Sequence, residues 1–481
     1  MKTISSLMML LFTYAAHAQI ADSPDDSVAG IPVNYTEAKV GAYTLPDVLK
    51  LVDGQPVRDA ATWFEKRRPE IVRLFEENQY GRSPGHPADM EFDVFEKAAP
   101  TFGGKAIRRQ VTIHFTKDKV GPSMDLLIYL PASVGKPVPL LLNLGFGANS
   151  TMVNDPNVKV GTMFDRRQNQ RVPMTQGFGG MNVLPILEKG FGFATFNYGD
   201  VDPDAPGAIA HGVRKLYLKN GQTEPAPDEW GAIAAWAWGI SRAIDYFETD
   251  KEVDAQRIAI TGISRLGKTV LWAGARDTRI AMVIASCSGE GGAALSRRNY
   301  GETIKHLAAP TRYSYQFCAN YGKWADNVSK FPVDAHMLLA LIAPRPVLLQ
   351  TGNTDKWSDP YGEFLAAVAA GPVYELLGKQ GLGTDKMPAA GEPILHTIGF
   401  FMHAGGHGSA PADWPVFLEF MQMHLQPLQA VAPRSDQRFS SSSVADCNPG
   451  LATVTVARPE VLVLCTIASP LPRDAFRSGE R

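Results

Sequence analysis

The stretch Thr261–Lys268, TGISRLGK, decides the fold of this chain. It follows Arg257–Ile260, a short apolar run of strand length, and it precedes residues 269–275, which are typical of the start of a helix. The glycines on both sides of Ser264 keep bulk away where a strand turns sharply into a helix. Such a turn lifts the serine hydroxyl above the edge of a sheet. The plainer alternative is a serine that merely caps a helix.

Strand and helix patterns alternate on both sides of this stretch. We expect strands at residues 106–115, 124–130, 138–144, 193–197, 280–285, 344–350 and 394–399, and helices at residues 59–79, 229–247, 361–370 and 413–424. Alternation of this kind favours a mostly parallel sheet with helices on both faces. We therefore predict an α/β-hydrolase fold, a three-layer α/β/α sandwich, in which Gly-x-Ser-x-Gly is the nucleophile elbow.

Composition and charge limit the function classes. The chain has 481 residues, of which 45% are hydrophobic and 20% are charged, as in an ordinary globular protein. A net charge of −2 gives no sign of a nucleic-acid partner or of a basic membrane-binding surface, and beyond the N-terminus no apolar run is long enough to span a bilayer. We expect neither partner, and we expect a monomer.

The N-terminus has the features of an export signal. A positive charge comes first, Ile4–Tyr14 is largely apolar, and Ala16-His17-Ala18 is a small-x-small cleavage site. We predict a signal peptide at residues 1–18 and a secreted or periplasmic protein. Residues 19–429 then form one hydrolase domain. Residues 430–481 are a C-terminal tail with a serine-rich part, a composition typical of disorder.

Catalysis by Ser264 requires a base within hydrogen-bonding reach and a carboxylate that orients the base. In α/β-hydrolases the chain order is serine, acid, histidine. His407 lies in the glycine-rich stretch His403–Gly408, after the last expected strand and before the closing helix, where the base belongs. The alternatives are His403 and, more weakly, His396.

The acid is predicted from its place after the strand at residues 344–350. Asp355 lies in the loop that follows this strand, and Asp359 in the same loop is the alternative. The acid would fix the tautomer of His407 and stabilise the imidazolium. An Asp-Pro pair such as Asp359-Pro360 is often only a turn. We therefore favour Asp355.

Three further residues are suited to binding a sugar. Lys268 lies one turn beyond Ser264, Glu302 lies in a glycine-containing loop, and Trp357 follows the acid candidate. A lysine and a carboxylate can bind hydroxyl groups, and an aromatic face can stack on a sugar ring. Their plainer interpretations are a helix-surface lysine, a loop carboxylate and a core tryptophan.

The cysteines give no sign of a metal site. The chain contains Cys287, Cys318, Cys447 and Cys465, and none has the spacing of metal ligands. We expect no metal and no cofactor. Export makes disulfides feasible, and Cys287 with Cys318 is one conceivable pair.

Two loops are expected to lie near the serine, and a third segment is an acidic turn. Gly145–Asn149 follows a strand where this fold often supplies a second oxyanion-hole amide. Residues 150–182 form a long loop-rich region, which we interpret as a wall of the substrate cleft. Asp200, Asp202 and Asp204 alternate as in a calcium loop, but they lack the glycine and the distal glutamate of an EF-hand. We therefore expect a solvated turn there.

The elbow resembles the signature of a known family. Gly262-x-Ser264-Arg265-x-Gly267-Lys268 is similar to the signature of the glucuronoyl esterases, carbohydrate esterase family 15. The resemblance runs from about residue 45 to about residue 427. Its other segments are Arg67–Glu70, Tyr80–Arg82, Gly289–Ala294, Leu338–Arg345, Trp357–Pro360 and Gly405–His407.

The resemblance implies a metal-free serine esterase. Its substrate would be the ester between 4-O-methyl-glucuronic acid on glucuronoxylan and a lignin alcohol, and its partners would be lignin-carbohydrate esters. The nucleophile would be Ser264 and the base His407, while Arg265 would help to hold the oxyanion. The positions that bind the glucuronate moiety would be Lys268, Glu302 and Trp357.

Two positions depart from the fungal members of this family. Fungal enzymes carry the acid as a glutamate at the end of the strand after the elbow, where this chain has Cys287. Many bacterial members place an acid after the later strand, as Asp355 is placed here. Glu290 is a further candidate acid because it is only three residues beyond Cys287. Ile263 replaces the cysteine that precedes the fungal serine, so the fungal active-site disulfide cannot form.

Two other functions remain open at this point. One is a related polysaccharide esterase, such as an acetyl xylan esterase. The other is a non-catalytic carbohydrate-binding protein on a hydrolase scaffold, against which the intact set of Ser264, Asp355 and His407 argues.

Overall fold

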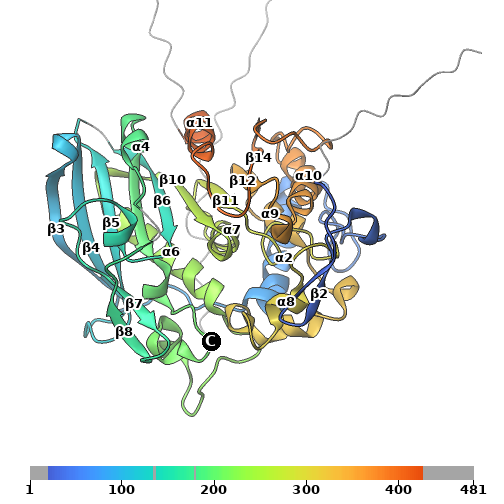
Figure 1. The fold of residues 1–481 in the computed structure, drawn as a ribbon, viewed down its shortest axis with the longest axis horizontal. Helices are drawn as coiled ribbons and strands as arrows, with labels where there is room; N and C mark the ends of the chain where they lie inside the picture. Colours follow the sequence, from blue (N-terminus) through green and yellow to red (C-terminus); the bar gives the residue numbers. More distant parts are fainter. Residues whose placement is uncertain (1–19, 134–136, 178–179, 426–481) are drawn as a thin grey trace, which may run out of the picture. The chain divides into compact units, whose positions relative to one another are not determined.

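The protein is described by a computed structural model over residues 20–133, 137–177 and 180–425 (Figure 1). The predicted signal peptide (1–18) and the predicted C-terminal tail (430–481) lie outside these residues. All of the described residues belong to one compact unit. None of the described helices combines the length and the apolar character needed to cross a membrane.

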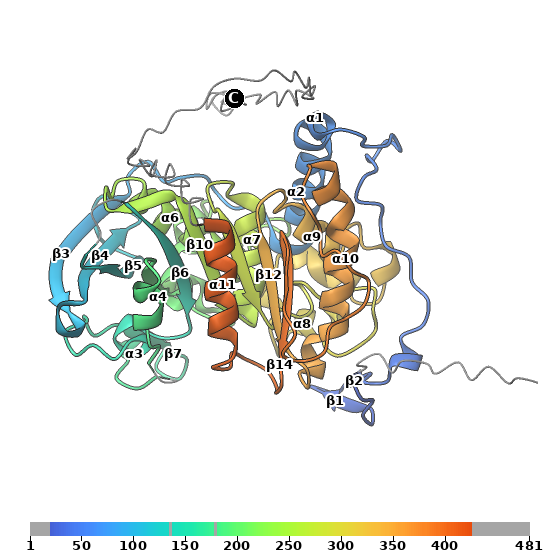
Figure 2. The same ribbon diagram turned by 90° about the horizontal axis from the view of Figure 1, so that it is seen from above.

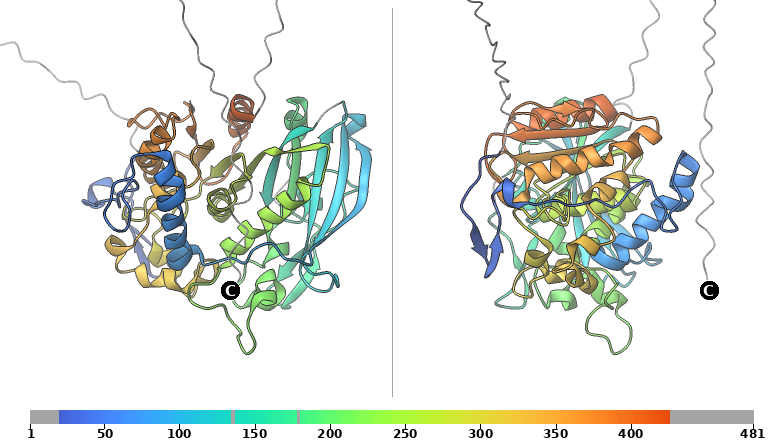
Figure 3. Two further views of the ribbon diagram at one scale, coloured as in Figure 1. Left: turned by 180° about the vertical axis from the view of Figure 1, so that it is seen from behind. Right: turned by 90° about the vertical axis from the view of Figure 1, so that its right-hand side faces the viewer.

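A ten-stranded sheet forms the centre of the unit. The strands, in sheet order, are β13 (Ile394–Leu395), β14 (Ile398–His403), β12 (Val347–Gly352), β11 (Met282–Ser286), β10 (Val253–Ile263), β6 (Val138–Gly145), β9 (Gly192–Asn197), β5 (Ser123–Pro131), β4 (Ala106–His114) and β3 (Glu91–Thr101). The six strands from β14 to β9 are parallel, and both ends of the sheet are antiparallel. Figures 1 and 3 show β3 and β4 (blue to cyan) at the end of the sheet opposite β12 and β14 (orange).

Helices cover both faces of the sheet. One face carries α2 (Arg68–Phe75), α6 (Ala232–Phe247), α7 (Arg265–Arg276), α9 (Ala335–Ala340) and α10 (Pro360–Leu376), and the other carries α4 (Leu184–Glu188) and α11 (Asp413–Leu425). Figure 2 shows α4 and α11 over the same side of the sheet. Leu140 and Leu142 of β6 pack in the first core, and Leu141 packs in the second. Since the side chains of a strand alternate, this division confirms the predicted three-layer sandwich.

Short elements complete the unit. They are β1 (Asp26–Val28), β2 (Ile31–Val33), α1 (Ala60–Thr62), α3 (Asn149–Met152), β7 (Thr162–Asp165), β8 (Gln170–Pro173), α5 (Tyr198–Val201) and α8 (Ile304–Ala308). The helix expected at residues 59–79 is continuous from α1 to Tyr80, with π-helical turns on each side of α2.

The structure corrects the expected strands in three places. The last strand is Ile398–His403, because the expected 394–399 covers the two-residue β13 and only the start of β14. β3 was not predicted, since its side chains are mostly half-buried or exposed and charged residues interrupt its apolar ones. The loop-rich region 150–182 contains the antiparallel hairpin of β7 and β8.

The conceivable disulfide between Cys287 and Cys318 is wrong, because both thiols are free and buried. Cys287 follows β11 and contacts Gly408, whereas the backbone N–H of Cys318 donates to the carbonyl oxygen of Gln79. The two cysteines therefore serve different parts of the core. Cys447 and Cys465 lie outside the described residues.

Candidate active site

The elbow turn has the strained geometry that the sequence predicted. Ser264 separates β10 from α7 with φ 59° and ψ −125°, a conformation that is costly for a residue other than glycine. Its N–H donates to the carbonyl oxygen of Ser286 at 2.8 Å. A Cβ atom on Gly262 would lie 2.5 Å from the carbonyl oxygen of Leu266, and one on Gly267 would lie 2.7 Å from that of Ser286. Only glycines therefore allow this close approach.

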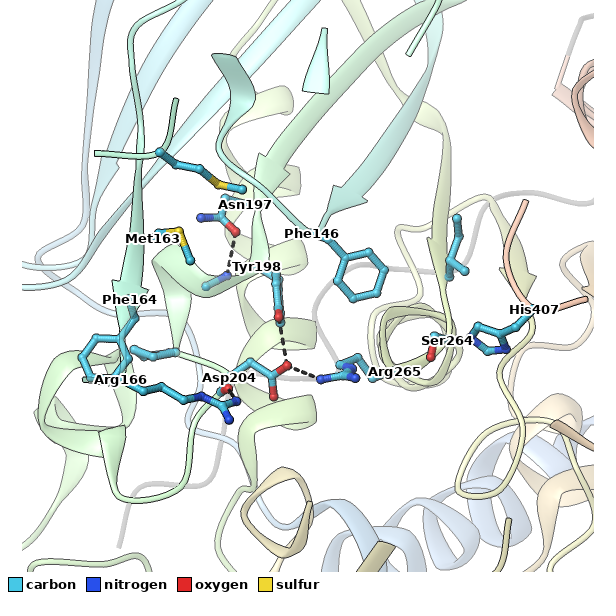
Figure 4. A pocket seen from close by; sticks show the side chains of 14 residues that line it. Phe146, Met163, Phe164, Arg166, Asn197, Tyr198, Asp204, Ser264, Arg265 and His407 are labelled. Atoms are coloured by element: carbon cyan, nitrogen blue, oxygen red, sulfur yellow. Dashed lines mark hydrogen bonds and ion pairs between the residues drawn. The ribbon is translucent and has the colours of Figure 1, made fainter. Parts of the chain in front are cut away.

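His407 lies beside this serine and is paired with Asp355. In Figure 4 its ring points toward Ser264, and both residues line the same cavity. Nδ1 of His407 is 2.7 Å from Oδ2 of Asp355 and 3.2 Å from the hydroxyl of Ser358. Burial opposes ionisation of Asp355, but the hydrogen bond and charge attraction of His407, together with hydrogen bonds from Ser358, outweigh burial and lower the pKa of this carboxyl. Asp355 can therefore serve as an ionised partner for an imidazolium.

The other candidate acids have different partners. Asp359 caps α10 and binds Nε of Arg298 at 2.8 Å. Glu290 accepts hydrogen bonds from the hydroxyls of Ser296 and Tyr321, both at 2.7 Å. Burial raises the pKa of Glu290 to about 8, which favours its neutral form at neutral pH. The geometry thus selects Asp355 as the partner of the base.

The other candidate bases are engaged as well. Nδ1 of His403 lies 3.0 Å from Oδ1 of Asp413, and its Nε2 lies 3.0 Å from the carbonyl oxygen of Gly406. Nδ1 of His396 contacts the carbonyl oxygen of Leu382 at 2.9 Å. His403 therefore supports the loop that carries His407, rather than competing with it.

A cavity of about 170 Å³ lies on one side of Ser264, and we call it the charged pocket. It is lined by Ser264, Arg265, Lys268, Cys287, Glu302, Leu307, Arg312, Tyr313, Gln316, Asp355, Trp357, Ser358 and His407. It brings together the three predicted sugar-binding residues. Nζ of Lys268 donates to Glu302 at 3.2 Å, and the N–H of Glu302 donates to the carbonyl oxygen of Trp357 at 2.9 Å.

Sequence reasoning missed Arg312, which completes this cluster. Its guanidinium lies 3.4 Å from Glu302 and packs over the rings of Trp357 and Tyr313, with both centroids 5.0 Å away. Arg312 lies in an irregular segment after α8, where no periodic pattern marks a side chain as part of a site. The two tyrosines at positions 313 and 315, close to Arg312, were the available signal.

A larger cavity of about 590 Å³ lies on the other side of Ser264, and we call it the apolar pocket. Figure 4 shows its lining, which comprises Phe146, Met163, Phe164, Arg166, Met174, Asn197, Tyr198, Gly199, Pro203, Asp204, Ile263, Ser264, Arg265 and His407. The region 150–182 contributes Met163, Phe164, Arg166 and Met174, so it forms a wall of this cavity, and its role in a substrate cleft stays a prediction. Phe146 brings the predicted oxyanion loop to the same cavity.

The expectation of a solvated turn at Asp200, Asp202 and Asp204 is wrong. Asp202 is fully buried and accepts a hydrogen bond from Nε of Arg214 at 3.0 Å. Asp200 accepts one from the amide of Asn197 at 3.2 Å, and burial raises its pKa to about 7. Alternating aspartates in a sequence suggest a turn exposed to solvent. Whether their carboxyls are buried depends on the partners that the tertiary structure brings to them.

Asp204 connects this segment to the elbow. Arg265 forms an ion pair with it, and the hydroxyls of Tyr198 and Tyr315 donate to it at 2.9 and 2.6 Å. Burial disfavours the ionised form, but Arg265 and these donors outweigh burial and lower the pKa of Asp204. The guanidinium of Arg265 lies 4.9 Å from the ring centroid of Tyr313 and is thereby held between the two pockets. It is a fixed positive charge beside the hydroxyl of Ser264.

One group of described residues has the chemistry of metal ligands. A thiol, a carboxylate and an imidazole, from Cys287, Asp355 and His407, have ligand atoms that all lie within 4.8 Å of one another. The cysteine occupies the end of β11, next to the pair of acid and base. No periodicity or spacing in the sequence indicated this proximity, because the three residues come from three different loops.

Comparisons with known proteins agree with this geometry. A model of the family "glucuronyl esterase, fungi" matches residues 148–378. Carbohydrate esterase MZ0003, from an unknown prokaryotic organism, is 43% identical over 84% of this chain and 95% of its own length. The structure of a glucuronoyl esterase from Solibacter usitatus is 46% identical and has a TM-score of 0.78, covering 81% of this chain and all of that one. A 4-O-methyl-glucuronoyl methylesterase from Phanerochaete carnosa is 27% identical over 69% of this chain and 72% of its own length.

Proposed function

Since this chain belongs to the glucuronoyl esterases of carbohydrate esterase family 15 and is a carboxylic ester hydrolase, we propose how its site acts on its substrate. The ester joins 4-O-methyl-glucuronic acid of glucuronoxylan to a lignin alcohol. The uronyl part occupies the charged pocket, and the alcohol occupies the apolar pocket.

The charged pocket is the observation that carries this orientation. Lys268 and Arg312 both contact Glu302, so two cations and one carboxylate are held together beside Trp357. Charged donors and acceptors that are already in place can bind the hydroxyls of a sugar without much loss of side-chain freedom. The flat face of Trp357 suits the sugar ring. The apolar pocket also contains an ion pair, between Arg265 and Asp204, but the phenylalanine and methionine side chains of its wall suit an apolar alcohol better than a sugar.

The reaction follows from the geometry around Ser264. His407, oriented by Asp355, takes the proton of the hydroxyl while the serine oxygen attacks the carbonyl carbon of the uronyl ester. The N–H of Arg265 at the start of α7 and the guanidinium of the same residue stabilise the oxyanion. His407 then gives its proton to the departing alcohol. Water, activated by His407, hydrolyses the glucuronoyl-enzyme and releases the acid.

The division of the site has a consequence for specificity. Contacts in the charged pocket involve only the acid part of the ester, so they act alike on every leaving alcohol. Contacts in the apolar pocket distinguish one alcohol from another through buried apolar area. We therefore expect tolerance toward the alcohol, with a preference for aromatic alcohols over methanol.

The benzyl ester of glucuronic acid tests this function directly. We expect the protein to hydrolyse it, and we expect the Ser264→Ala variant to be inactive, because a nucleophile that forms a covalent intermediate cannot be replaced by a methyl group. Acetylated xylan serves as the parallel substrate. Release of acetate without cleavage of the uronate would indicate an acetyl xylan esterase instead. Inactivity toward both substrates would favour a non-catalytic carbohydrate-binding protein. Labelling by a serine-directed phosphonate would show instead that the serine is reactive and that the substrates were unsuitable.

Export is a further part of the proposal. The features of residues 1–18 support a secreted or periplasmic protein. The net charge of −2 supports the absence of nucleic-acid and membrane partners, and we propose that the protein is a monomer. Deletion of these residues should leave the esterase activity in the cytoplasmic fraction of a bacterial host, whereas the full chain should deliver it to the periplasm or the medium. If the full chain and the deletion variant gave the same distribution of activity between these fractions, the assignment of a signal peptide would be contradicted.

A further inference from the structure

The thiol of Cys287 lies next to the paired base and acid. Cys287 directly follows β11 and has a left-handed backbone, with φ 45°. Its Sγ lies 3.4 Å from both the carbonyl oxygen and the N–H of Gly408, the residue next to the base. Although only 1% of its surface is exposed, it lines the charged pocket together with Asp355 and His407. The reaction described above makes no use of this thiol.

We propose that Cys287, Asp355 and His407 form an inhibitory binding site for a thiophilic divalent cation, of which Zn²⁺ is the type case. Zn²⁺ takes thiolate sulfur, imidazole nitrogen and carboxylate oxygen at about 2.0 to 2.3 Å, usually in tetrahedral geometry. The three ligand atoms lie within 4.8 Å of one another, so small movements around one ion bring all of them into range. The charged pocket opens onto them, which supplies an entry path and room for a water molecule as the fourth ligand.

The nearby cations do not prevent this binding. Lys268 and Arg312 both contact Glu302, and Arg265 is paired with Asp204. The three positive charges of the pocket are therefore partly balanced by two carboxylates within the protein, Glu302 and Asp204. A divalent ion that enters meets the carboxylate of Asp355 and a thiol that becomes a thiolate on binding.

Binding at this position inactivates the base. Nδ1 of His407 faces Asp355, and the other nitrogen of the ring is the one available to Ser264. When the ion takes the lone pair of Nδ1, the single proton of the neutral imidazole resides on Nε2. That nitrogen then cannot accept the serine proton. The thiol proton passes to solvent, and no oxidation or reduction takes place. The inhibition rests on the proposed role of His407, but the binding of the ion does not.

A cadmium titration of the mature protein tests the binding without any substrate. Cd²⁺ bound to a thiolate gives a charge-transfer band in the ultraviolet. In a background that carries Cys447→Ser and Cys465→Ser, we expect this band with Cys287 intact and in Cys318→Ser, a matched variant at the other buried cysteine of the described residues. We expect its loss in Cys287→Ser. A band that survives in Cys287→Ser, or the absence of a band in the wild type, would overturn the site.

Inhibition by Zn²⁺ tests the consequence. Hydrolysis of benzyl glucuronate is measured at increasing Zn²⁺ for each protein, relative to its own rate without metal, and a chelator should restore that rate. Loss of an outer partner of a metal ligand already costs about 10- to 100-fold in affinity, so loss of the thiol should raise the inhibition constant by at least about tenfold. Cys318→Ser should behave as the wild type. The proposal would be overturned if Zn²⁺ inhibited Cys287→Ser and Cys287→Ala as strongly as it inhibits the wild type. If the protein proves inactive in the esterase assay, the cadmium titration still tests the binding of the ion.

Discussion

The two pockets beside Ser264 are built from different kinds of structure. The charged pocket consists of ion-paired and stacked side chains that follow the strands of the central sheet and the elbow helix. A wall of the apolar pocket is the hairpin of β7 and β8, which forms a separate two-stranded sheet. Charged groups need fixed partners to be retained in a partly buried site, and the ends of packed strands provide them. Apolar contacts require only shape, so an added hairpin would be sufficient to bind the alcohol that we propose for this pocket.

After Ser264→Ala, the largest effect should come from the acid of the triad, which acts on every ester alike. Asp355→Asn keeps the shape of the side chain but no longer stabilises the imidazolium, so kcat for methyl and benzyl glucuronate should fall alike by about 10⁴-fold. The measurement is steady-state hydrolysis of both esters. Asp254→Asn is the matched control, since it removes a half-exposed ion pair with Arg257 on the strand that carries Ser264. Near-normal turnover by Asp355→Asn would remove this residue from the mechanism.

A smaller effect should mark the charged pocket. Lys268→Met removes the hydrogen bond that the charged ammonium donates to a sugar hydroxyl. A hydrogen bond to a charged group contributes about 1.5 to 3 kcal/mol, so kcat/KM should fall by about 10- to 100-fold for every ester of glucuronic acid. The ratio between benzyl and methyl esters should stay unchanged. Lys305→Met is the control, because the ion pair of Lys305 with Asp326 is exposed. A changed ratio would mean that Lys268 contacts the alcohol.

The apolar pocket should show the reverse pattern. Met163→Ala removes part of the wall, and because 44% of Met163 is exposed, the loss of contact with a benzyl group should be only about 1 kcal/mol, or about fivefold in kcat/KM. The methyl ester should be hardly affected. Met423→Ala on α11 is the matched control, with 54% of its side chain exposed away from the site. An equal loss for both esters would place the alcohol elsewhere.

The smallest effect on activity is expected at Glu290. Its pKa is raised from 4.5 to about 8, so the folded protein keeps a proton there that the unfolded chain loses. The stability contributed by this proton is complete below pH 4.5 and is lost as the pH rises through about 8. Glu290→Gln, which does not titrate, should flatten the fall in thermal stability over this range and leave turnover within about twofold of the wild type.

Thermal unfolding at several pH values measures this difference, and the hydrolysis of benzyl glucuronate accompanies it. A loss of turnover as large as that of Asp355→Asn would make Glu290 the triad acid after all. An unchanged dependence of stability on pH would mean that Glu290 is ionised in the folded protein.

The elbow could be predicted because local chemistry imposes it. A serine at positive φ between glycines that cannot carry a Cβ is a short-range constraint, and it appears in the sequence as Gly-x-Ser-x-Gly. The buried parallel strands were equally visible, since β6, β9 and β12 are rich in apolar residues and buried along their whole length. The strand β3 lacks such a run because it lies at the edge of the sheet, half exposed to solvent.

From the sequence, several partners could be proposed for each site residue, but it could not be decided which of them makes the contact. Asp355, Asp359 and Glu290 are all carboxylates near a predicted strand end, and only the fold shows that Asp355 meets His407 while the other two face Arg298 and Tyr321. Asp204 and Arg312 were missed for the same reason, because their roles depend on side chains far away in the chain.

By itself, the sequence determined the fold class and the family of this protein, and it predicted the nucleophile and the base. These features rest on spacing within a few residues, where covalent geometry and turn sterics leave few choices. Only the tertiary structure decided which carboxylate orients the base, that two unlike pockets flank the serine, and that a thiol lies behind the base. These three features depend on which loops lie next to one another at the edge of the sheet. The packing of the whole core determines the positions of those loops.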